Sequence, residues 1–351
     1  MKQFSIKFIA IMMACILAVA CGNRKQSSTS ISLSGAGATF PEPFYSMAFD
    51  SYSHQSGNTV NYGGIGSGGG VRNLKDMIVD FAGSDAFLSD EEIAEMEPVV
   101  HIPTCMGAVV LGVNLPEVPE IKLSGAVVAD IFSGKIKQWN DVRICALNPL
   151  AKLPNKAIVP VFRSDGSGTT FVFTHYLSQV SEDWANLYGA AKSVDFPVGQ
   201  AAKGNPGVAS VVSQTPYSIG YIGSEYAFAQ HLPMAVMQNS RGEFISPTVE
   251  SISAAAKGDL PADTRTMITD SDAKGAYPIS CFTWLIVYQE QHYAERTLDQ
   301  AKATVSLLKY MLSDPNQQSA KLVNYAPLPK QMVKMSLENI KKMTYDGSPI
   351  E

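Results

Sequence analysis

The stretch FRSDGSGTTFVF, which runs from Phe162 to Phe173, joins a strand-like run to a helix start through a turn of glycine and hydroxyl residues. Two other stretches share this design: SGAGATFPEPF, from Ser34, and GGIGSGGGVRNL, from Gly63. A helix N-terminus exposes unpaired N–H groups and about half a positive charge, so it can bind an anion without any lysine. If the three turns converge, they form an anion cage.

Several side chains in these turns are suited to an oxyanion. Hydroxyl donors come from Thr39, Ser67, Ser167 and Thr169, and the neighbouring glycines allow a close approach of the backbone. Arg163, four places before Ser167, adds a charged, fork-shaped donor. Taken singly, each turn also fits an ordinary turn or helix cap, and Arg163 fits a surface ion pair with Asp165.

Asp85, in the segment DFAGSDAFLSD, places a carboxylate after a strand-like run. An ionised carboxylate only accepts hydrogen bonds, so beside an anion it needs an oxyanion that keeps a proton. Hydrogen phosphate has such a proton near neutral pH, whereas sulfate does not. Asp85 therefore favours phosphate over sulfate or molybdate, the alternative being a turn or cap residue.

Apolar or β-branched runs alternate with helical patterns from Leu33 onward, which predicts an α/β fold. Ser89 and Glu92 form the pattern of a capping box. The expected strands cover residues 31–34, 59–63, 78–83, 108–114, 157–163, 218–221 and 283–288. The expected helices cover residues 43–55, 69–77, 90–96, 169–179 and 298–312.

Length and charge narrow the function classes. The chain has 351 residues, which suggests two domains at about 150 residues each. Its 27 basic and 32 acidic residues give a formal net charge of -5, and this acidic balance argues against a nucleic-acid partner. Local dipoles must therefore hold any bound anion.

The N-terminus carries export signals. Residues 1–20 have early lysines and then an apolar run too short to span a bilayer, which predicts a signal peptide. LAVAC, ending at Cys21, resembles a lipobox, so we expect an acylated Cys21 and a lipid-anchored tether over residues 21–32. Ala18 stands where a lipobox prefers leucine, and Ala18 to Ala20 also fits an ordinary cleavage site.

Cys105, Cys145 and Cys281 are the remaining cysteines beyond Cys21, an odd number that excludes a full disulfide framework. Buried free thiols are one interpretation. A disulfide between Cys105 and Cys281, just beyond two proposed crossovers between lobes, is the other. The five histidines lie far apart, so we expect neither a metal nor a cofactor.

Eight segments together resemble a known family. GAGATFP, NYGGIGSGGGV, DFAGSDAFLSD, DGSGTTFVF, IFSGKIKQWND, KGNPGVA, SIGYI and NYAPLP are similar, in order from about Ser34 to about Met335, to the phosphate-binding proteins of bacterial phosphate ABC transporters. The resemblance implies that Asp85 is a proton acceptor. It implies that the phosphate-binding residues are Thr39, Phe40, Ser67, Asp85, Arg163, Ser167, Gly168 and Thr169.

The resemblance also implies a fold and a role. The expected fold is the two-lobe periplasmic-binding-protein fold (type II, Venus flytrap), with a mixed sheet flanked by helices in each lobe. Lobe 1 would comprise residues 33–103 plus 279–351, and lobe 2 residues 104–278. The implied role is capture of inorganic phosphate and its delivery to a membrane-embedded permease, by a monomer that is not an enzyme and is exported to the periplasm as a membrane-anchored lipoprotein.

Two enzyme classes compete with this interpretation. GIGSGG, from Gly64, matches the G-x-G-x-x-G pattern of nicotinamide-binding oxidoreductases, with Asp85 about 20 residues downstream. That assignment leaves the other two turns unexplained. A serine hydrolase would need G-x-S-x-G around its nucleophile, and neither Ser67 nor Ser167 has that context.

Overall fold

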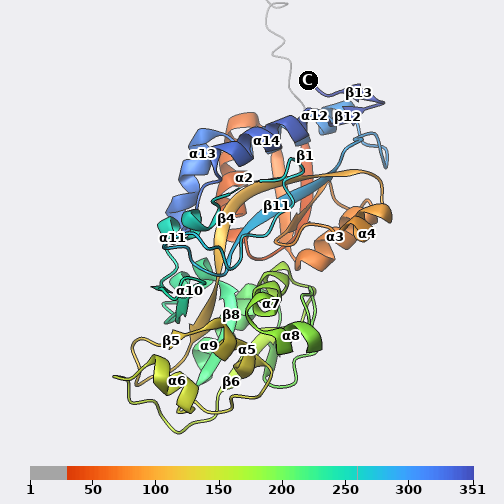
Figure 1. Cartoon of the computed structure of the whole chain (residues 1–351). Helices are drawn as coiled ribbons and strands as arrows, with labels where there is room; N and C mark the ends of the chain where they lie inside the picture. Colours follow the sequence, from red (N-terminus) through yellow and green to blue (C-terminus); the bar gives the residue numbers. More distant parts are fainter. Residues whose placement is uncertain (1–29, 259) are drawn as a thin grey trace, which may run out of the picture.

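The computed structural model describes residues 30–258 and 260–351. The expected signal peptide, Cys21 and most of the expected tether lie outside the described residues. The described part forms two lobes, one above the other in Figure 1. None of its helices has both the length and the apolar character needed to cross a membrane.

The upper lobe in Figure 1 contains the strand order β2-β1-β3-β11-β4. β1 is parallel to β2 and β3, whereas β11 is antiparallel to β3 and β4. The strands are β1 (Ser32–Gly37), β2 (Thr59–Gly64), β3 (Phe81–Ser84), β4 (Val99–Val113) and β11 (Ser280–Tyr288). The helices around them are α2 (Glu42–Ser56), α3 (Ser67–Lys75), α4 (Asp90–Ala94), α12 (Leu298–Met311), α13 (Asp314–Ser319) and α14 (Lys330–Ile340).

The lower lobe continues the same sheet as β4-β8-β6-β7. β8 is antiparallel to β4, and β6 is parallel to both β8 and β7. The strands are β6 (Val159–Arg163), β7 (Gln200–Ala202) and β8 (Ser218–Gly223). The helices are α5 (Gly125–Phe132), α6 (Val142–Leu147), α7 (Gly168–Val180), α8 (Glu182–Leu187), α9 (Gly204–Gln214) and α10 (Ser224–Ala229).

Shorter elements complete the chain. A three-stranded sheet has the order β10-β9-β5, and β12 and β13 form a hairpin. The bounds are β5 (Lys122–Leu123), β9 (Val236–Gln238), β10 (Phe244–Ile245), β12 (Thr344–Tyr345), β13 (Ser348–Pro349), α11 (Val249–Ala255) and the 3₁₀ helix η1 (Ala320–Val323). The core lies on both faces of the central strands, since every residue of β8 and β11 is buried.

β4 joins the two lobes. It pairs with β11 up to Ala108 and with β8 from Val109, so one strand belongs to both halves of the sheet. Its register with β11 shifts near Pro103, where Thr104 forms a bulge opposite the Thr283/Trp284 step. The sequence predicted only the second half of this strand, because proline and polar residues interrupt the apolar run before Met106. The expected lobe boundaries stay a prediction.

The other expected elements are present, with ends shifted by up to a few residues. The expected strand 78–83, for example, is β3 at Phe81–Ser84. The capping box is confirmed: Ser89 Oγ accepts from the Glu92 N–H at 3.2 Å, and Glu92 Oε2 accepts from the Ser89 N–H at 2.9 Å.

The interpretation of Cys105 and Cys281 as a disulfide is wrong. Both cysteines are buried and free. Cys105 pairs in register with Thr283, and Cys281 pairs with Gly107, so the two cysteines are diagonal neighbours on adjacent strands. Diagonal pairs lie about 7–8 Å apart, which is beyond the usual span of a disulfide.

Candidate anion-binding site

The structure brings the three glycine-rich turns together where the upper and lower lobes touch. The Gly68 N–H donates to the Gly166 carbonyl at 2.9 Å, and the Gly168 N–H donates to Ser67 Oγ at 3.0 Å. Both bonds join the turn after β2 to the turn after β6. The first turn joins the same contact through Thr39 Oγ1, which accepts from the Asn205 N–H at 3.1 Å. The lobes are therefore closed on each other at the candidate site.

Thr39 and Phe40 lie between β1 and α2, and both are buried. The Thr39 hydroxyl faces the lower lobe. The Phe40 ring instead packs edge-on against Tyr325, with ring centroids 6.0 Å apart. Any contribution of Phe40 to anion binding therefore comes from its backbone, which the packed ring holds in place.

Ser67 is the first residue of α3 and is fully buried. Gly66 before it has φ 90°, a left-handed conformation that favours glycine. A Cβ on Gly66 would also meet the Gly166 carbonyl at 2.8 Å. Glycine at this position therefore allows both the turn into α3 and the close contact between lobes.

Arg163 ends β6 and forms a bidentate ion pair with Asp165. Its Nε lies 2.8 Å from Asp165 Oδ1 and its Nη2 lies 2.5 Å from Oδ2. The pair is the one considered from the sequence, but it is buried, with the arginine side chain only 1% exposed. Burial would raise the pKa of Asp165, yet the hydrogen bonds and charge of Arg163 hold that pKa below its usual value.

The second guanidinium edge faces the site. Arg163 Nη1 lies 3.4 Å from Thr169 Oγ1. Asp165 fixes the fork through Nε and Nη2, which leaves Nη1 directed at the group of hydroxyls. The Asp165 carboxylate also accepts from the Gly204 N–H at 3.0 Å, so it ties β6 to the start of α9.

The Asp85 carboxyl lies at the end of β3 and is 1% exposed. Its Oδ1 accepts from the Thr283 hydroxyl at 2.9 Å and its Oδ2 from the Thr169 hydroxyl at 3.3 Å. Burial raises the pKa of Asp85 to about 7, against the hydrogen bond from Thr283, the charge of Arg163 and the hydrogen bond from Thr169. The carboxyl therefore exchanges a proton near neutral pH.

Ser167, Gly168 and Thr169 form the start of α7. Ser167 is the N-cap, and its Oγ accepts from the Thr170 N–H at 3.1 Å. A Cβ on Gly168 would meet Ser67 Oγ at 2.6 Å, so glycine is required for this contact. The first N–H groups of α3, α7 and α9 all lie at the closed contact, where helix N-termini favour an anion.

Three side chains at the site were not predicted as site residues from the sequence. Asp165 was considered only as a surface partner of Arg163, and Thr283 only as part of a strand. Asn205 lies in KGNPGVA, which supported the family resemblance but carried no assigned role. The run Gly204-Asn205-Pro206, which is typical of a turn into a helix start, was a local signal that could have been used.

Hydrogen bonds connect six of the eight expected residues, with Asn205 as the link to Thr39: Ser67, Gly168, Asp85, Thr169, Arg163 and Thr39. Phe40 and Ser167 adjoin this buried group along the chain, and Asp85 is the single carboxyl among the eight. Within the described residues, no group of three or more His, Cys, Asp or Glu side chains is placed to hold a metal ion. A group of donors around one carboxyl acceptor is suited to an oxyanion that retains a proton.

Comparison with known proteins agrees with this geometry. Residues 23–315 match the model of the PBP superfamily domain. The chain is 38% identical to the phosphate-binding protein PstS of Pasteurella multocida, over 91% of this chain and 93% of that protein. It is 41% identical to the phosphate-binding protein PstS of Haemophilus influenzae, over 86% and 90%. The chain belongs to the phosphate-binding protein family of ABC transporters.

Solved structures show the family fold. A phosphate-binding protein from Stenotrophomonas maltophilia superposes with a TM-score of 0.67 at 20% identity, over 89% of this chain and 94% of that one. A putative phosphate ABC transporter substrate-binding protein from Clostridium perfringens, solved with bound phosphate, gives 0.62 at 18% identity, over 85% and 100%. The expected two-lobe periplasmic-binding-protein fold is confirmed.

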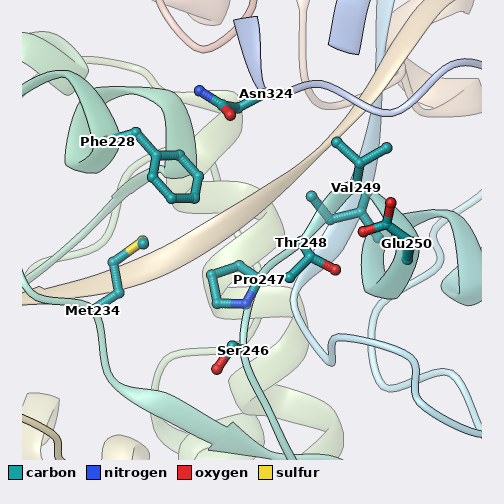
Figure 2. Close-up of a pocket in the computed structure, with 9 residues that line it drawn as sticks. Phe228, Met234, Ser246, Pro247, Thr248, Val249, Glu250 and Asn324 are labelled. Atoms are coloured by element: carbon teal, nitrogen blue, oxygen red, sulfur yellow. The ribbon is translucent and has the colours of Figure 1, made fainter. Parts of the chain in front are cut away.

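A cavity of about 430 Å³, away from the glycine-rich turns, has different chemistry. Figure 2 shows Phe228, Met234 and Pro247 around it, with Asn324 at one side and Glu250 at another. The lining is mainly apolar and its ionisable group is an acid, which disfavours an anion. The site between the glycine-rich turns is therefore the candidate for phosphate.

Proposed function

We propose that this protein captures inorganic phosphate between its two lobes and delivers it to an ABC importer. The observation that supports the proposal most directly is the buried Asp85 carboxyl within a group of buried donors. An oxyanion with a proton can donate to this carboxyl and accept from every other group. Phosphate meets that requirement near neutral pH.

Each of the eight residues has a role in the proposal. Arg163 Nη1 and the hydroxyls of Thr39, Ser67, Ser167 and Thr169 donate to phosphate oxygens. The backbone N–H groups of Phe40 and Gly168, at helix starts, add dipolar donors. Asp85 accepts the proton that phosphate retains. The close pairing of Asp165 with Arg163 supports this assignment, because it fixes the direction of the guanidinium.

The physical basis of selectivity is the unmatched charge that sulfate would create. An ionised Asp85 facing a fully ionised oxyanion in a dry site has no proton between the two groups, so they repel each other. A site built around one obligatory hydrogen bond rejects an analogue without that bond by about 10⁴-fold or more.

Calorimetric titration of the purified protein with phosphate, and separately with sulfate, at pH 8.5, where Asp85 is ionised, tests the proposal. We expect phosphate to bind at least about 10⁴-fold more tightly than sulfate. Comparable affinities for the two anions would contradict the role of Asp85 and remove the main support for phosphate as the ligand.

The proposal extends to the setting of the protein. It includes export to the periplasm, acylation of Cys21, a monomeric state, a permease as partner and the absence of catalysis. It also includes lobes made of residues 33–103 plus 279–351 and residues 104–278, which open and close about β4 and the segment before β11. Metabolic labelling with a radioactive fatty acid, compared between the native protein and Cys21→Ser, tests the anchor.

A further inference from the structure

Asn205 is the second residue of α9 and is fully buried at the contact between lobes. Its backbone N–H donates to Thr39 Oγ1 at 3.1 Å, and its side-chain Nδ2 donates to the same oxygen at 3.0 Å. Nδ2 also donates to Thr169 Oγ1 at 3.1 Å. One carboxamide thus reaches a hydroxyl of the upper lobe and a hydroxyl of the lower lobe.

The orientation of this carboxamide is fixed from its other end. Asn205 Oδ1 accepts from the Gly223 N–H at 3.0 Å, at the end of β8. A flipped amide would direct Nδ2 at that N–H and lose the bond, so Nδ2 must face the two threonines. The backbone of β8 therefore determines that Asn205 presents donors, and not an acceptor, to the site.

This arrangement constrains the threonine protons. A hydroxyl has one hydrogen to donate and two lone pairs that accept. Thr39 Oγ1 accepts twice from Asn205, and Thr169 Oγ1 accepts once from Asn205 and once from Arg163 Nη1. Because the accepting positions of both oxygens are filled, each hydroxyl must act as a donor to whatever it faces next. For Thr169 that acceptor is Asp85 Oδ2 in this structure.

We propose that Asn205 is a positioning residue that makes Thr39 and Thr169 obligatory proton donors to the bound anion and couples this polarity to closure of the lobes. The inference rests on the proposed function, since the anion is the phosphate assigned there. When the lobes separate, Thr39 leaves Asn205 and its hydroxyl is free to rotate. Closure would then set the donor direction at the moment the anion is enclosed.

Asn205→Asp tests this polarity with little change in shape. An ionised carboxylate at this position accepts the protons of Thr39 and Thr169 and places a negative charge against the anion. We expect phosphate affinity at pH 8 to fall by at least 100-fold. As the pH is lowered to 5, the new carboxyl takes up a proton and can donate again, so the ratio of variant to native affinity should recover by at least tenfold.

Asn148→Asp is the matched control. Asn148 is also buried in the lower lobe, and its carboxamide donates to the Lys122 and Ile144 carbonyls and accepts from the Lys122 N–H. We expect this variant to lower the melting temperature while leaving phosphate affinity within about twofold of native at every pH.

A double-mutant cycle covers the case in which Asn205→Asp does not fold. Phosphate affinity is measured for the native protein, Asn205→Ala, Thr39→Val and the double variant. If Asn205 acts through Thr39, the loss caused by Asn205→Ala shrinks by at least fivefold once Thr39 is valine. Equal losses in the two backgrounds overturn the inference.

The two proposals fail in different ways. A native protein that binds no phosphate overturns the proposed function, and this inference with it. A native protein that binds phosphate tightly, together with an Asn205→Asp variant whose affinity is pH-independent relative to native, overturns the role of Asn205 alone.

Discussion

At the scale of single residues, Asp85 differs from every other group around the anion, because it accepts hydrogen bonds where the others donate them. Arg163 and the hydroxyls can all donate, whereas Asp85 is held by two donors of its own, Thr283 and Thr169. Its raised pKa shows that the hydrogen bonds compensate only part of the cost of burying its charge. Bound hydrogen phosphate would replace Thr169 as a donor to Asp85, and the single Thr169 proton would then go to the anion.

Asp85→Asn should therefore change the selectivity more than the fold. Removing the charge ends the repulsion of sulfate, so the affinity for sulfate, measured directly by calorimetry, should rise at least about tenfold, and sulfate should displace labelled phosphate at a correspondingly lower concentration. Loss of one charge-assisted hydrogen bond should weaken phosphate binding by about 1.5–3 kcal/mol, roughly 10- to 150-fold. Asp270→Asn removes one half-buried acid elsewhere and should leave the competition unchanged. Unaltered sulfate competition in Asp85→Asn would contradict the assignment.

Asp85 should also make the stability of the ligand-free protein depend on pH. Its pKa is raised from 3.8 to about 7, so the folded state binds a proton that the unfolded chain releases above pH 4. The stability from this group is present below about pH 4 and is lost as pH rises through about 7, by an amount of order 4 kcal/mol. Urea unfolding at pH 4 and 8 should show Asp85→Asn gaining stability relative to native. Parallel pH profiles would show that Asp85 titrates normally.

At the scale of elements, the site is made where strands of both lobes end and helices begin. β2 leads into α3 through Gly66, and β6 leads into α7 through Ser167, so each turn directs backbone N–H groups at the same region. A helix start can approach another turn this closely only where no side chain intervenes. The glycines at these turns are therefore required by the contact as well as by the backbone conformation.

Gly66→Ala should weaken phosphate binding by at least tenfold, because the added Cβ would clash with the Asp165 carboxylate, meet the Gly166 carbonyl at 2.8 Å and obstruct closure. Gly57→Ala is a control for an added Cβ at a positive-φ glycine: Gly57 is left-handed, with φ 77° and ψ -1°, and nothing lies within 4 Å of the added Cβ. Gly57→Ala should lose about 1 kcal/mol of stability from backbone strain, and Gly66→Ala should lose more, because φ 90° with ψ 149° is essentially restricted to glycine. Calorimetric titration should show weaker phosphate binding for Gly66→Ala than for Gly57→Ala. Equal phosphate affinities of the two variants would show that the contact at Gly66 does not govern closure.

At the scale of the whole molecule, closure joins surfaces that belong to opposite lobes. Glu92, on α4 of the upper lobe, pairs with Lys192, in the segment between α8 and β7 of the lower lobe, at 2.6 Å. The Lys192 carbonyl also accepts from the Ser167 N–H, which links this pair to the start of α7. The pair is formed only where the lobes meet, so it stabilises the closed arrangement.

Lys192→Met should accelerate phosphate release and weaken affinity by no more than about fivefold, the scale of a partly exposed ion pair. The effect should shrink at high salt, because screening already weakens the native pair. Lys75→Met is the control: it breaks the Lys75–Glu95 pair inside the upper lobe and should leave the release rate unchanged. Stopped-flow release of phosphate at two salt concentrations provides the measurement. An unchanged release rate in Lys192→Met would show that the Lys192–Glu92 ion pair does not contribute to the free energy of lobe closure.

Much of the fold followed from local pattern. The alternation of apolar runs with helix starts predicts the strands and helices around the site, and the predicted capping box at Ser89 is confirmed. The first half of β4 was missed because the pairing across the bulge at Thr104 is not a local property. The possible disulfide between Cys105 and Cys281 is wrong for a similar reason, because the register between β4 and β11 decides which side chains are adjacent.

The sequence by itself determined the chemical parts of the site: three glycine-rich helix starts, their hydroxyls, Arg163 and the carboxyl of Asp85. Residue type and short-range spacing suffice for these, because caps, turns and helix dipoles depend on a few neighbouring residues. Only the tertiary structure decided that Arg163 is buried against Asp165, that Thr283 donates to Asp85, and that Asn205 joins Thr39 to Thr169. These contacts link residues up to 198 positions apart, and lobe closure and strand register, which no local pattern encodes, bring them within hydrogen-bond distance.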